Sequence, residues 1–183
     1  MTNIVPLSAI ASSEKARLLG EAVEIFFETA HIKVFDSALA KGAFCERWFG
    51  RYLDTQPEFF FLALDGGGAA IGYLAGCLDS FSRSARAIIR DIPYYTPAFQ
   101  KAVATCPSHF HINVKPGYQG HGVGRLLVVR FLEACAASGS TGAHVATGAQ
   151  SRAVHFYRAC GFRPLALPET DPGLAVLAYA TLS

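Results

Sequence analysis

Residues 109–127 read HFHINVKPGYQGHGVGRLL, and this stretch decides the fold. Apolar and polar side chains alternate along residues 108–114 and predict a β-strand, whereas the apolar spacing after residue 122 predicts an amphipathic helix. The turn between them is rich in glycine, and it directs backbone amides outward at the positive end of the helix dipole. The segment therefore predicts a binding site for an anionic diphosphate.

The spacing of the glycines shows which of the known types of phosphate-binding turn this segment matches. A dinucleotide-binding G-x-G-x-x-G fingerprint is excluded because Arg125 stands where its third glycine belongs, and a P-loop is excluded because no Gly-Lys-Ser/Thr follows. Residues 119–124, QGHGVG, instead match a Q/R-x-x-G-x-G/A turn.

That turn resembles the one used by the GNAT superfamily of N-acetyltransferases. A second match lies downstream, where residues 153–162, AVHFYRACGF, resemble the family's closing A-x-x-F-Y-x-x-x-G-F helix and turn. With the Val114-x-Pro116 strand end, the resemblance covers about residues 59–165. It implies an α/β (α+β) fold in a single domain over residues 1–183. In that fold, helices flank a mixed, mostly antiparallel twisted sheet of about six to seven strands.

The resemblance also implies acetyl-CoA as the acyl donor. The backbone of residues 112–114 would pair with the pantetheine arm, and the amides of residues 119–124 would hold the pyrophosphate, with His121 and Arg125 beside it. At residue 150 a glutamine replaces the family's common asparagine, and its longer amide would have to make the same contact. The cofactor-binding residues implied in this way are Ile112, Asn113, Val114, Gln119, Gly120, His121, Gly122, Val123, Gly124, Arg125, Gln150, Ala153 and Phe156.

The implied catalytic acid is Tyr157, whose hydroxyl would protonate the departing thiolate. The alternative is that its ring only packs between helix and sheet. An ammonium with a pKa of about 10 must also lose a proton before it attacks the thioester. The family often uses a glutamate for this step, and strand 108–114 contains none, so His109 and His111 are the candidate bases. Both lie on one face of the strand with Asn113, and either could instead form hydrogen bonds within the core.

Four further side chains have a functional and a structural interpretation. Asp79 could orient a histidine or bind the substrate ammonium, or it could form a turn. His144 could join the histidine cluster, or be a core histidine. Tyr94 and Tyr95 could line the mouth of the substrate site, or cover the core.

The remaining pattern predicts alternating helices and strands. We expect helices at 13–31 (with a serine N-cap), from after Ser37 to about 53, at 122–138 and at 151–160. We expect strands at 59–64, 70–78, 108–114, 142–148, 162–167 and 174–182. The first two strands form a hairpin around Asp65-Gly66-Gly67-Gly68. Residues 80–107 suit a long connection with one short helix, of the kind that often serves as a substrate loop.

The composition of the chain limits the class of protein and the kinds of partner that we expect. The chain is 51% hydrophobic and 16% charged, so it can bury a core. With no apolar run near 20 residues and no basic N-terminal leader, we expect a soluble, cytoplasmic protein that does not bind membranes. The five cysteines form no Cys-x-x-Cys pair, so we expect reduced thiols and no metal site. The net charge of +2 gives no indication of nucleic-acid binding.

Residues 69–79, 109–113 and 142–149 also resemble the acetyltransferase-like domain that accompanies some protein O-GlcNAcases, and its free-standing bacterial relatives. Two functions therefore stay open. The first is transfer of an acetyl group from acetyl-CoA to an amine-bearing acceptor by direct attack in a ternary complex. The second is a non-catalytic acetyl-CoA-binding or protein-recognition module. A nucleotide-binding α/β domain is a third interpretation. Many relatives of this size form homodimers, which leaves the oligomeric state open as well.

Overall fold

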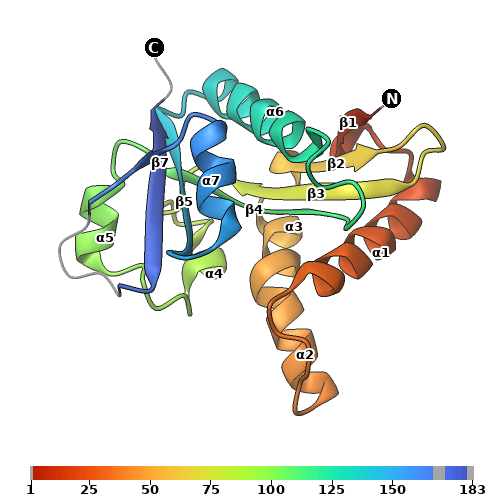
Figure 1. The fold of residues 1–183 in the computed structure, drawn as a ribbon, viewed down its shortest axis with the longest axis horizontal. Coiled ribbons are helices and arrows are strands. Elements are labelled where there is room, and N and C mark those ends of the chain that lie inside the picture. The colour runs from red at the N-terminus through yellow and green to blue at the C-terminus, as the bar shows by residue number, and fades with distance from the viewer. Residues whose placement is uncertain (1, 167–171, 181–183) are drawn as a thin grey trace. The chain divides into compact units, whose positions relative to one another are not determined.

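The computed structural model describes residues 2–166 and 172–180 (Figure 1). The strands are β1 (Asn3–Pro6), β2 (Phe60–Leu64), β3 (Ala70–Cys77), β4 (Ser108–Val114), β5 (Gly142–Gly148), β6 (Arg163–Pro164) and β7 (Leu174–Ala180). The α-helices are α1 (Ser12–Thr29), α2 (Ala38–Cys45), α3 (Arg51–Thr55), α4 (Arg86–Ile89), α5 (Pro97–Ala102), α6 (Val123–Ala137) and α7 (Arg152–Ala159). Short 3-10 turns η1 (Leu7–Ala9) and η3 (Pro57–Phe59) and a π turn η2 (Glu46–Gly50) complete the described elements.

Hydrogen bonds join the strands in the order β1-β2-β3-β4-β5-β7-β6, as a seven-stranded sheet. The described ladders are antiparallel except for that of β4 with β5. This confirms the expected fold class. The chain divides into two compact units: residues 1–76 with 111–131 form unit 1, and residues 77–110 with 132–183 form unit 2. The single domain over residues 1–183 stays a prediction.

The N-terminal part of unit 1 differs from the sequence expectation in three places. Strand β1 was not predicted, and it pairs with β2. The N-cap of α1 is Ala11, which has no side chain that could cap, so the predicted serine cap is wrong. The helix expected to start after Ser37 does begin at Ala38, and the Oγ of the N-cap Ser37 accepts the Ala40 amide at 3.1 Å, but the π turn divides the helix into α2 and α3.

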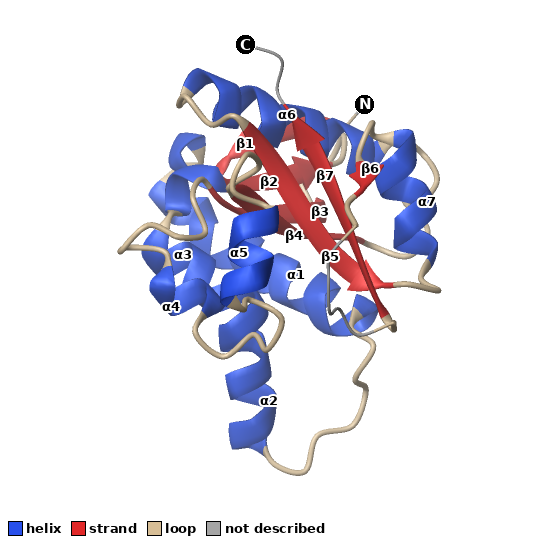
Figure 2. Ribbon diagram, turned by 90° about the vertical axis from the view of Figure 1, so that its left-hand side faces the viewer, coloured by secondary structure: helices blue, strands red, loops and turns tan. Residues whose placement is uncertain are grey.

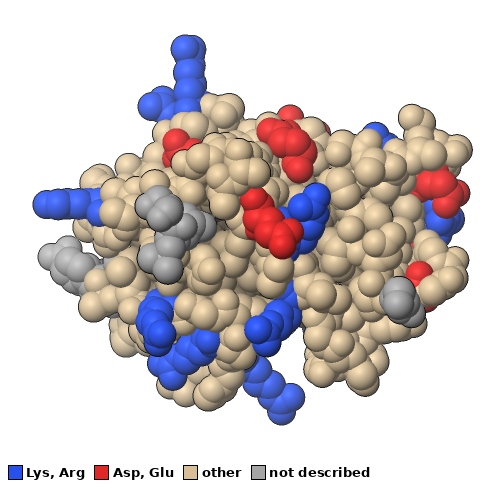
Figure 3. All heavy atoms as spheres, turned by 90° about the horizontal axis from the view of Figure 1, so that it is seen from above, with Lys and Arg blue, Asp and Glu red and all other residues tan. Residues whose placement is uncertain are grey.

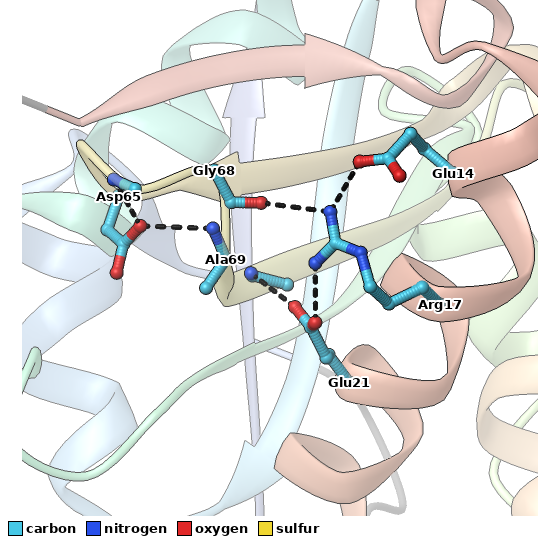
Figure 4. Close-up of polar contacts among 8 residues, drawn as sticks. Glu14, Arg17, Glu21, Asp65, Gly68 and Ala69 are labelled. Atoms are coloured by element: carbon cyan, nitrogen blue, oxygen red, sulfur yellow. Dashed lines mark hydrogen bonds and ion pairs between the residues drawn. The ribbon is translucent and has the colours of Figure 1, made fainter.

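The β2–β3 hairpin forms where Asp65 and three glycines interrupt the apolar strands. The Asp65 carboxylate accepts the amides of Gly67 at 2.9 Å and Ala69 at 3.0 Å (Figure 4). Gly68 has a φ of 81°, which favours glycine because other side chains are strained there. The hydrogen bonds that the backbone amides of Ala69 and Gly67 donate lower the pKa of the Asp65 carboxyl.

Helix α1 is tied to the same turn by charged side chains (Figure 4). The Arg17 guanidinium donates to Glu14 and Glu21, each at 2.6 Å, and to the Gly68 carbonyl at 3.4 Å. The other carboxylate oxygen of Glu21 accepts the Ala70 amide at 2.7 Å. The first two ion pairs are exposed, and pairs of that kind contribute about 0–1 kcal/mol each, so their main effect is to fix where α1 meets the hairpin.

The faces of β3 differ in the size of their side chains. On one face the rings of Tyr73, Phe49 and Phe60 pack together, with centroids 5.0 and 5.8 Å from that of Tyr73. On the other face lie Gly72 and Gly76. A Cβ on Gly76 would lie 2.3 Å from the Phe131 ring, so α6 packs directly against the backbone of β3. This close contact positions α6, and with it the turn that precedes the helix.

Unit 2 is built on the long antiparallel pair β5 and β7 (Figure 2). Ser108 and His109 of β4 pair in parallel with Ala143 and His144 of β5. Phe99 and Val103 pack with Val176 in a buried cluster. The connection 80–107 contains two short helices, α4 and α5, where one was expected. The strand expected over 162–167 is shorter, and residues 167, 181 and 182 of the last two predicted strands lie outside the described residues.

On the face shown in Figure 3, the Lys and Arg side chains stand in separate groups, with Asp and Glu among them, in keeping with the net charge of +2. None of the helices in residues 2–166 and 172–180 has the length and apolar character needed to cross a membrane.

Replacing Gly76 with alanine should destabilise the protein by about 1–3 kcal/mol, because the new methyl group needs space that Phe131 and the Phe59 carbonyl occupy. Urea unfolding followed by circular dichroism measures the change. Gly20→Ala is the matched control, since it lies in α1 with open space around it, and it should stabilise by about 0.5–1 kcal/mol. Equal effects of the two substitutions would contradict the close packing of α6.

Candidate active site

The glycine-rich turn of unit 1 has the backbone that an anion site requires. Gly117, Gly120 and Gly122 have φ values of 81°, 78° and 85°, so three residues of this short turn adopt the left-handed conformation. A Cβ added at any of them would meet open space, so backbone conformation favours glycine there. Helix α6 starts at Val123, and a helix leaves its first amides without partners in the helix.

Side chains on either side of the turn hold it in shape. The Gln119 side-chain amide donates to the Val114 carbonyl at 2.9 Å, which links the turn to the end of β4. The His121 ring donates from Nδ1 to the Gln119 carbonyl at 2.9 Å. The Tyr118 hydroxyl bonds the Asp65 carboxylate, so the β2–β3 hairpin also supports the turn. The Gln119 side chain therefore stabilises the conformation of the turn. The backbone amides remain the candidate phosphate ligands.

His111 lies in unit 1 at the end of a short hydrogen-bond chain. The Asn113 side-chain amide donates to the Tyr73 hydroxyl at 2.8 Å, and that hydroxyl is 3.2 Å from Nδ1 of His111. The direction of the contact with His111 follows the tautomer of the ring: with the proton of the neutral imidazole on Nε2, Nδ1 accepts from the Tyr73 hydroxyl. Burial lowers the pKa of His111 to about 4, and it raises the pKa of the Tyr73 hydroxyl.

Aromatic rings surround His111 within unit 1. Its ring centroid lies 5.9 Å from those of Phe26 and Trp48 and 6.2 Å from that of Tyr73. Trp48 comes from the π turn, and Phe26 from α1. The sequence analysis did not identify Tyr73 or Trp48 as neighbours of the candidate base, because both belong to apolar stretches that read as core.

His109 lies in unit 2 with the opposite tautomer. The Ser80 hydroxyl donates its only proton to the Pro107 carbonyl at 2.6 Å, so it accepts from Nδ1 of His109, also at 2.6 Å. The lone pair of the neutral ring is then on Nε2. Burial and the nearby His144 hold the pKa of His109 well below its usual value.

His144 stands opposite His109 in the parallel β4–β5 ladder, with ring centroids 5.7 Å apart. Its Nδ1 donates to the Cys106 carbonyl at 2.6 Å, so its Nε2 accepts from the Tyr95 hydroxyl at 3.0 Å. Burial lowers its pKa to about 4. This geometry supports the core interpretation of His144, and it makes Tyr95 part of the same cluster.

Asp79 uses its hydrogen-bonding groups within a turn. Its carboxylate accepts the Phe81 amide at 2.9 Å, and its carbonyl accepts the Ser82 hydroxyl at 2.9 Å. The contact that was expected between Asp79 and a histidine is made by the next residue, Ser80, which is fully buried. Ser80 gave no signal in the sequence except its place at the strand end.

Tyr157 lies in α7 of unit 2, and the Ser151 hydroxyl caps this helix by accepting the Ala153 amide at 3.1 Å. The Tyr157 ring is 8% exposed and packs 5.9 Å from both Phe110 and Phe162. Burial raises the pKa of its hydroxyl, so the phenol keeps its proton at neutral pH. The side chain therefore packs in the core of unit 2 with its hydroxyl protonated.

The predicted site residues fall into two sets. Residues 112–114 and 119–125 lie with His111 in unit 1. His109, Asp79 and Tyr157 lie in unit 2 with three predicted cofactor contacts, of which Gln150 is exposed, and Ala153 and Phe156 are half-buried. All five cysteines are free thiols. Within residues 2–166 and 172–180, no three His, Cys, Asp or Glu side chains are grouped so as to hold a metal ion.

Known structures with the same fold include enzymes of one superfamily. SsHAT superposes with a TM-score of 0.70 at 23% identity, over 100% of this chain and 99% of its own. A GNAT superfamily phosphinothricin acetyltransferase from Sinorhizobium meliloti, solved in complex with AcCoA, superposes with a TM-score of 0.58 at 19% identity, over 98% of this chain and 88% of its own. The ribosomal-protein-S18-alanine N-acetyltransferase from Escherichia coli superposes with a TM-score of 0.57 at 16% identity, over 98% of this chain and 94% of its own.

The sequence itself gives the family. Residues 56–164, more than half of the chain, match the acetyltransferase (GNAT) domain, and this region contains the glycine-rich turn and the helix with Tyr157. The family supports acyl transfer as the general activity. This chain belongs to the GNAT acetyltransferase family.

Proposed function

We propose that this protein transfers the acetyl group of acetyl-CoA to a primary amine by direct attack in a ternary complex. The observation that carries the proposal is the turn between β4 and α6. Its three left-handed glycines and the first amides of α6 form a diphosphate-binding arrangement. The superfamily relative solved with AcCoA supports the choice of donor.

The chain's own residues supply each step. The backbone of residues 112–114 pairs with the pantetheine arm, and the Val114 amide donates to the thioester oxygen as it gains negative charge. The amine loses a proton, attacks the carbonyl carbon, and the C–S bond breaks. Tyr157 then gives its proton to the departing sulfur, and the tyrosinate takes up the second proton that the attacking nitrogen loses as the amide forms.

The partners of Nδ1 distinguish the two candidate bases. In His109 this nitrogen donates to the Ser80 hydroxyl, whereas in His111 it is hydrogen-bonded to the Tyr73 hydroxyl. A proton passed to Nδ1 of His111 would have to enter through Tyr73. We assign the direct base role to His109 and give His111 a positioning role at the acceptor. His109→Gln should then lower kcat by about 10–10⁴-fold, and His111→Gln should act mainly on KM.

The pH profile tests this assignment. A base must be neutral to act, and burial holds the pKa of His109 well below 6.5 and that of His111 near 4. Between pH 6 and 8, kcat/KM should therefore rise steadily with pH as the free amine deprotonates, with no histidine step in that range. Initial rates of CoA release at constant ionic strength measure the profile. An acid limb with a pKa near 6.5 would contradict the buried, neutral histidines.

The donor site is tested at Gly122. Gly122→Glu should weaken CoA binding by at least about 100-fold, because a carboxylate would stand beside the diphosphate. Isothermal titration with CoA measures the affinity. Gly122→Ala has the same backbone strain without the charge, and Gly139→Glu introduces the same side chain at another positive-φ glycine in open space. Both controls should bind CoA better than Gly122→Glu, and unchanged affinity in a folded Gly122→Glu protein would refute the donor site.

Tyr157→Phe tests the acid. The ring and its packing remain, so acetyl-CoA affinity should be nearly unchanged while turnover falls by about 10–10⁴-fold. Steady-state kinetics with thiol detection measures the loss across pH. The expected loss is smallest at high pH, where the thiolate leaves without help, since thiols of this kind have a pKa of about 8.5. Wild-type turnover at every pH would show that Tyr157 is only a packing residue.

The second candidate is a non-catalytic acetyl-CoA-binding or protein-recognition module. Two observations favour it: Asp79 is occupied by a turn, and burial makes the histidines weak bases. Titration with acetyl-CoA followed by thiol release over a panel of amines separates the two functions. Binding without turnover on any amine would favour the module.

A further inference from the structure

Unit 2 contains a cavity that the proposed donor site does not use. Its volume is about 550 Å³, within the range of about 300–1,000 Å³ that is typical of small-molecule pockets. It lies in the long connection between β3 and β4, where the sequence predicted a substrate loop but contained no motif that named a substrate. The cavity is lined by Arg86, Ala87, Ile89, Arg90, Ile92 and Tyr95.

Two cations stand in the wall of this cavity. Arg86 begins α4 and Arg90 follows its last turn, and residues four apart lie on the same side of a helix. The described lining includes no carboxylate. Both guanidinium groups are exposed, so they can reach a ligand from solvent. Paired guanidinium groups suit carboxylate and phosphate because each presents several donors in one plane.

The rest of the wall is apolar or aromatic and lies close to the proposed chemistry. Ile92 is buried, and the Tyr95 hydroxyl donates to His144, whose ring is 5.7 Å from that of His109. The Tyr95 ring itself is 5.7 Å from the His109 ring. Through Tyr95 the cavity thus adjoins His109, the side chain to which we assign the base role.

We infer that the acceptor amine carries an anionic group, a carboxylate or a phosphate, which Arg86 and Arg90 bind while Ile89, Ile92 and Tyr95 contact its carbon skeleton. This inference rests on the proposed function, since it names the substrate class of the same reaction. It also makes a claim of its own, which is that an anion binds at these two arginines whether or not acetyl transfer follows.

The experiment uses matched acceptors that differ only in the anionic group. L-amino acids are compared with their amides, and O-phosphoethanolamine with ethanolamine, so that the two arms distinguish carboxylate from phosphate. In each arm the anionic amine should have a kcat/KM about 10-fold or more above that of its neutral partner, because hydrogen bonds between charged groups change the free energy of binding by enough to give that factor. Thiol release with acetyl-CoA gives the rates.

The variants locate the effect. Arg86→Gln and Arg90→Gln should each raise KM for the anionic acceptor by about 10-fold and leave the neutral member unchanged, whereas Arg86→Lys should retain part of the affinity. Arg83→Gln is the matched control, because it removes the same charge from the same segment but lies outside the cavity lining. It should behave like the wild type. Circular dichroism confirms that each variant is folded.

Binding is also measured without turnover, by titrating each amine into the protein. If the anionic amines bind the wild type and lose affinity in the Arg86→Gln/Arg90→Gln double variant, the anion site is established even where no amine releases CoA. In that case only the proposed acetyl transfer fails. If the anionic amines bind no better than their neutral partners, bind the double variant equally well, or do not bind at all, the inference is overturned.

Discussion

The close contact between α6 and β3 is the constraint on which the donor site depends. Phe131 occupies the space that a side chain at residue 76 would fill, and Leu127 and the Val114 side chain lie against the corresponding space at Gly72. Helix α6 can therefore approach the β3 backbone as closely as it does only because both residues are glycine. The helix end and the turn before it are positioned by this packing, and Gln119 then fixes the turn to the end of β4. A diphosphate site made of backbone amides has no long side chains that could adjust to the ligand, so rigid support of the backbone determines whether it works.

The histidines illustrate a second constraint, which is that a polar ring in the protein interior needs a hydrogen-bond partner. His109 and His144 are buried and His111 is half-buried, and their Nδ1 atoms bond Ser80, the Cys106 carbonyl and Tyr73, respectively. A neutral ring with a fixed tautomer presents its lone pair in a defined direction. The same burial that fixes the ring also lowers its pKa, so orientation is obtained at the expense of base strength. Such a base suits an amine that is already partly deprotonated or whose pKa falls when it binds.

Much of the fold could be predicted from the sequence, because long periodic segments and the glycine-rich turn are local signals. The helix at 122–138 was found within one residue of the observed Val123–Ala137, and the strand at 142–148 was found with its bounds. Strand β1 was missed because four residues with one proline carry too little pattern, and only pairing with β2 makes them a strand. The π turn was missed because the apolar rhythm through Trp48 and Phe49 reads as an ordinary helix. Of the site, the turn and Tyr157 were identified by motif. Ser80, Tyr73 and the cavity arginines were not, because their roles arise from contacts distant in sequence.

The π turn has a specific consequence for the acceptor side of unit 1. In a regular helix, adjacent residues point about 100° apart, so they do not normally contact the same sheet face equally. Here Trp48 reaches His111 with a centroid distance of 5.9 Å, while Phe49 packs at 5.0 Å from Tyr73, the residue that holds His111. The wider turn thus lets two consecutive rings support one imidazole, one directly and one through its hydrogen-bond partner. Because π turns are usually costlier than α-helix and tend to occur at functional sites, the cost at Glu46–Gly50 is best explained by the placement of Trp48 beside His111. In the proposed reaction, this aromatic surface beside the imidazole attracts the acceptor's ammonium group by a cation–π contact, which agrees with a positioning role for His111.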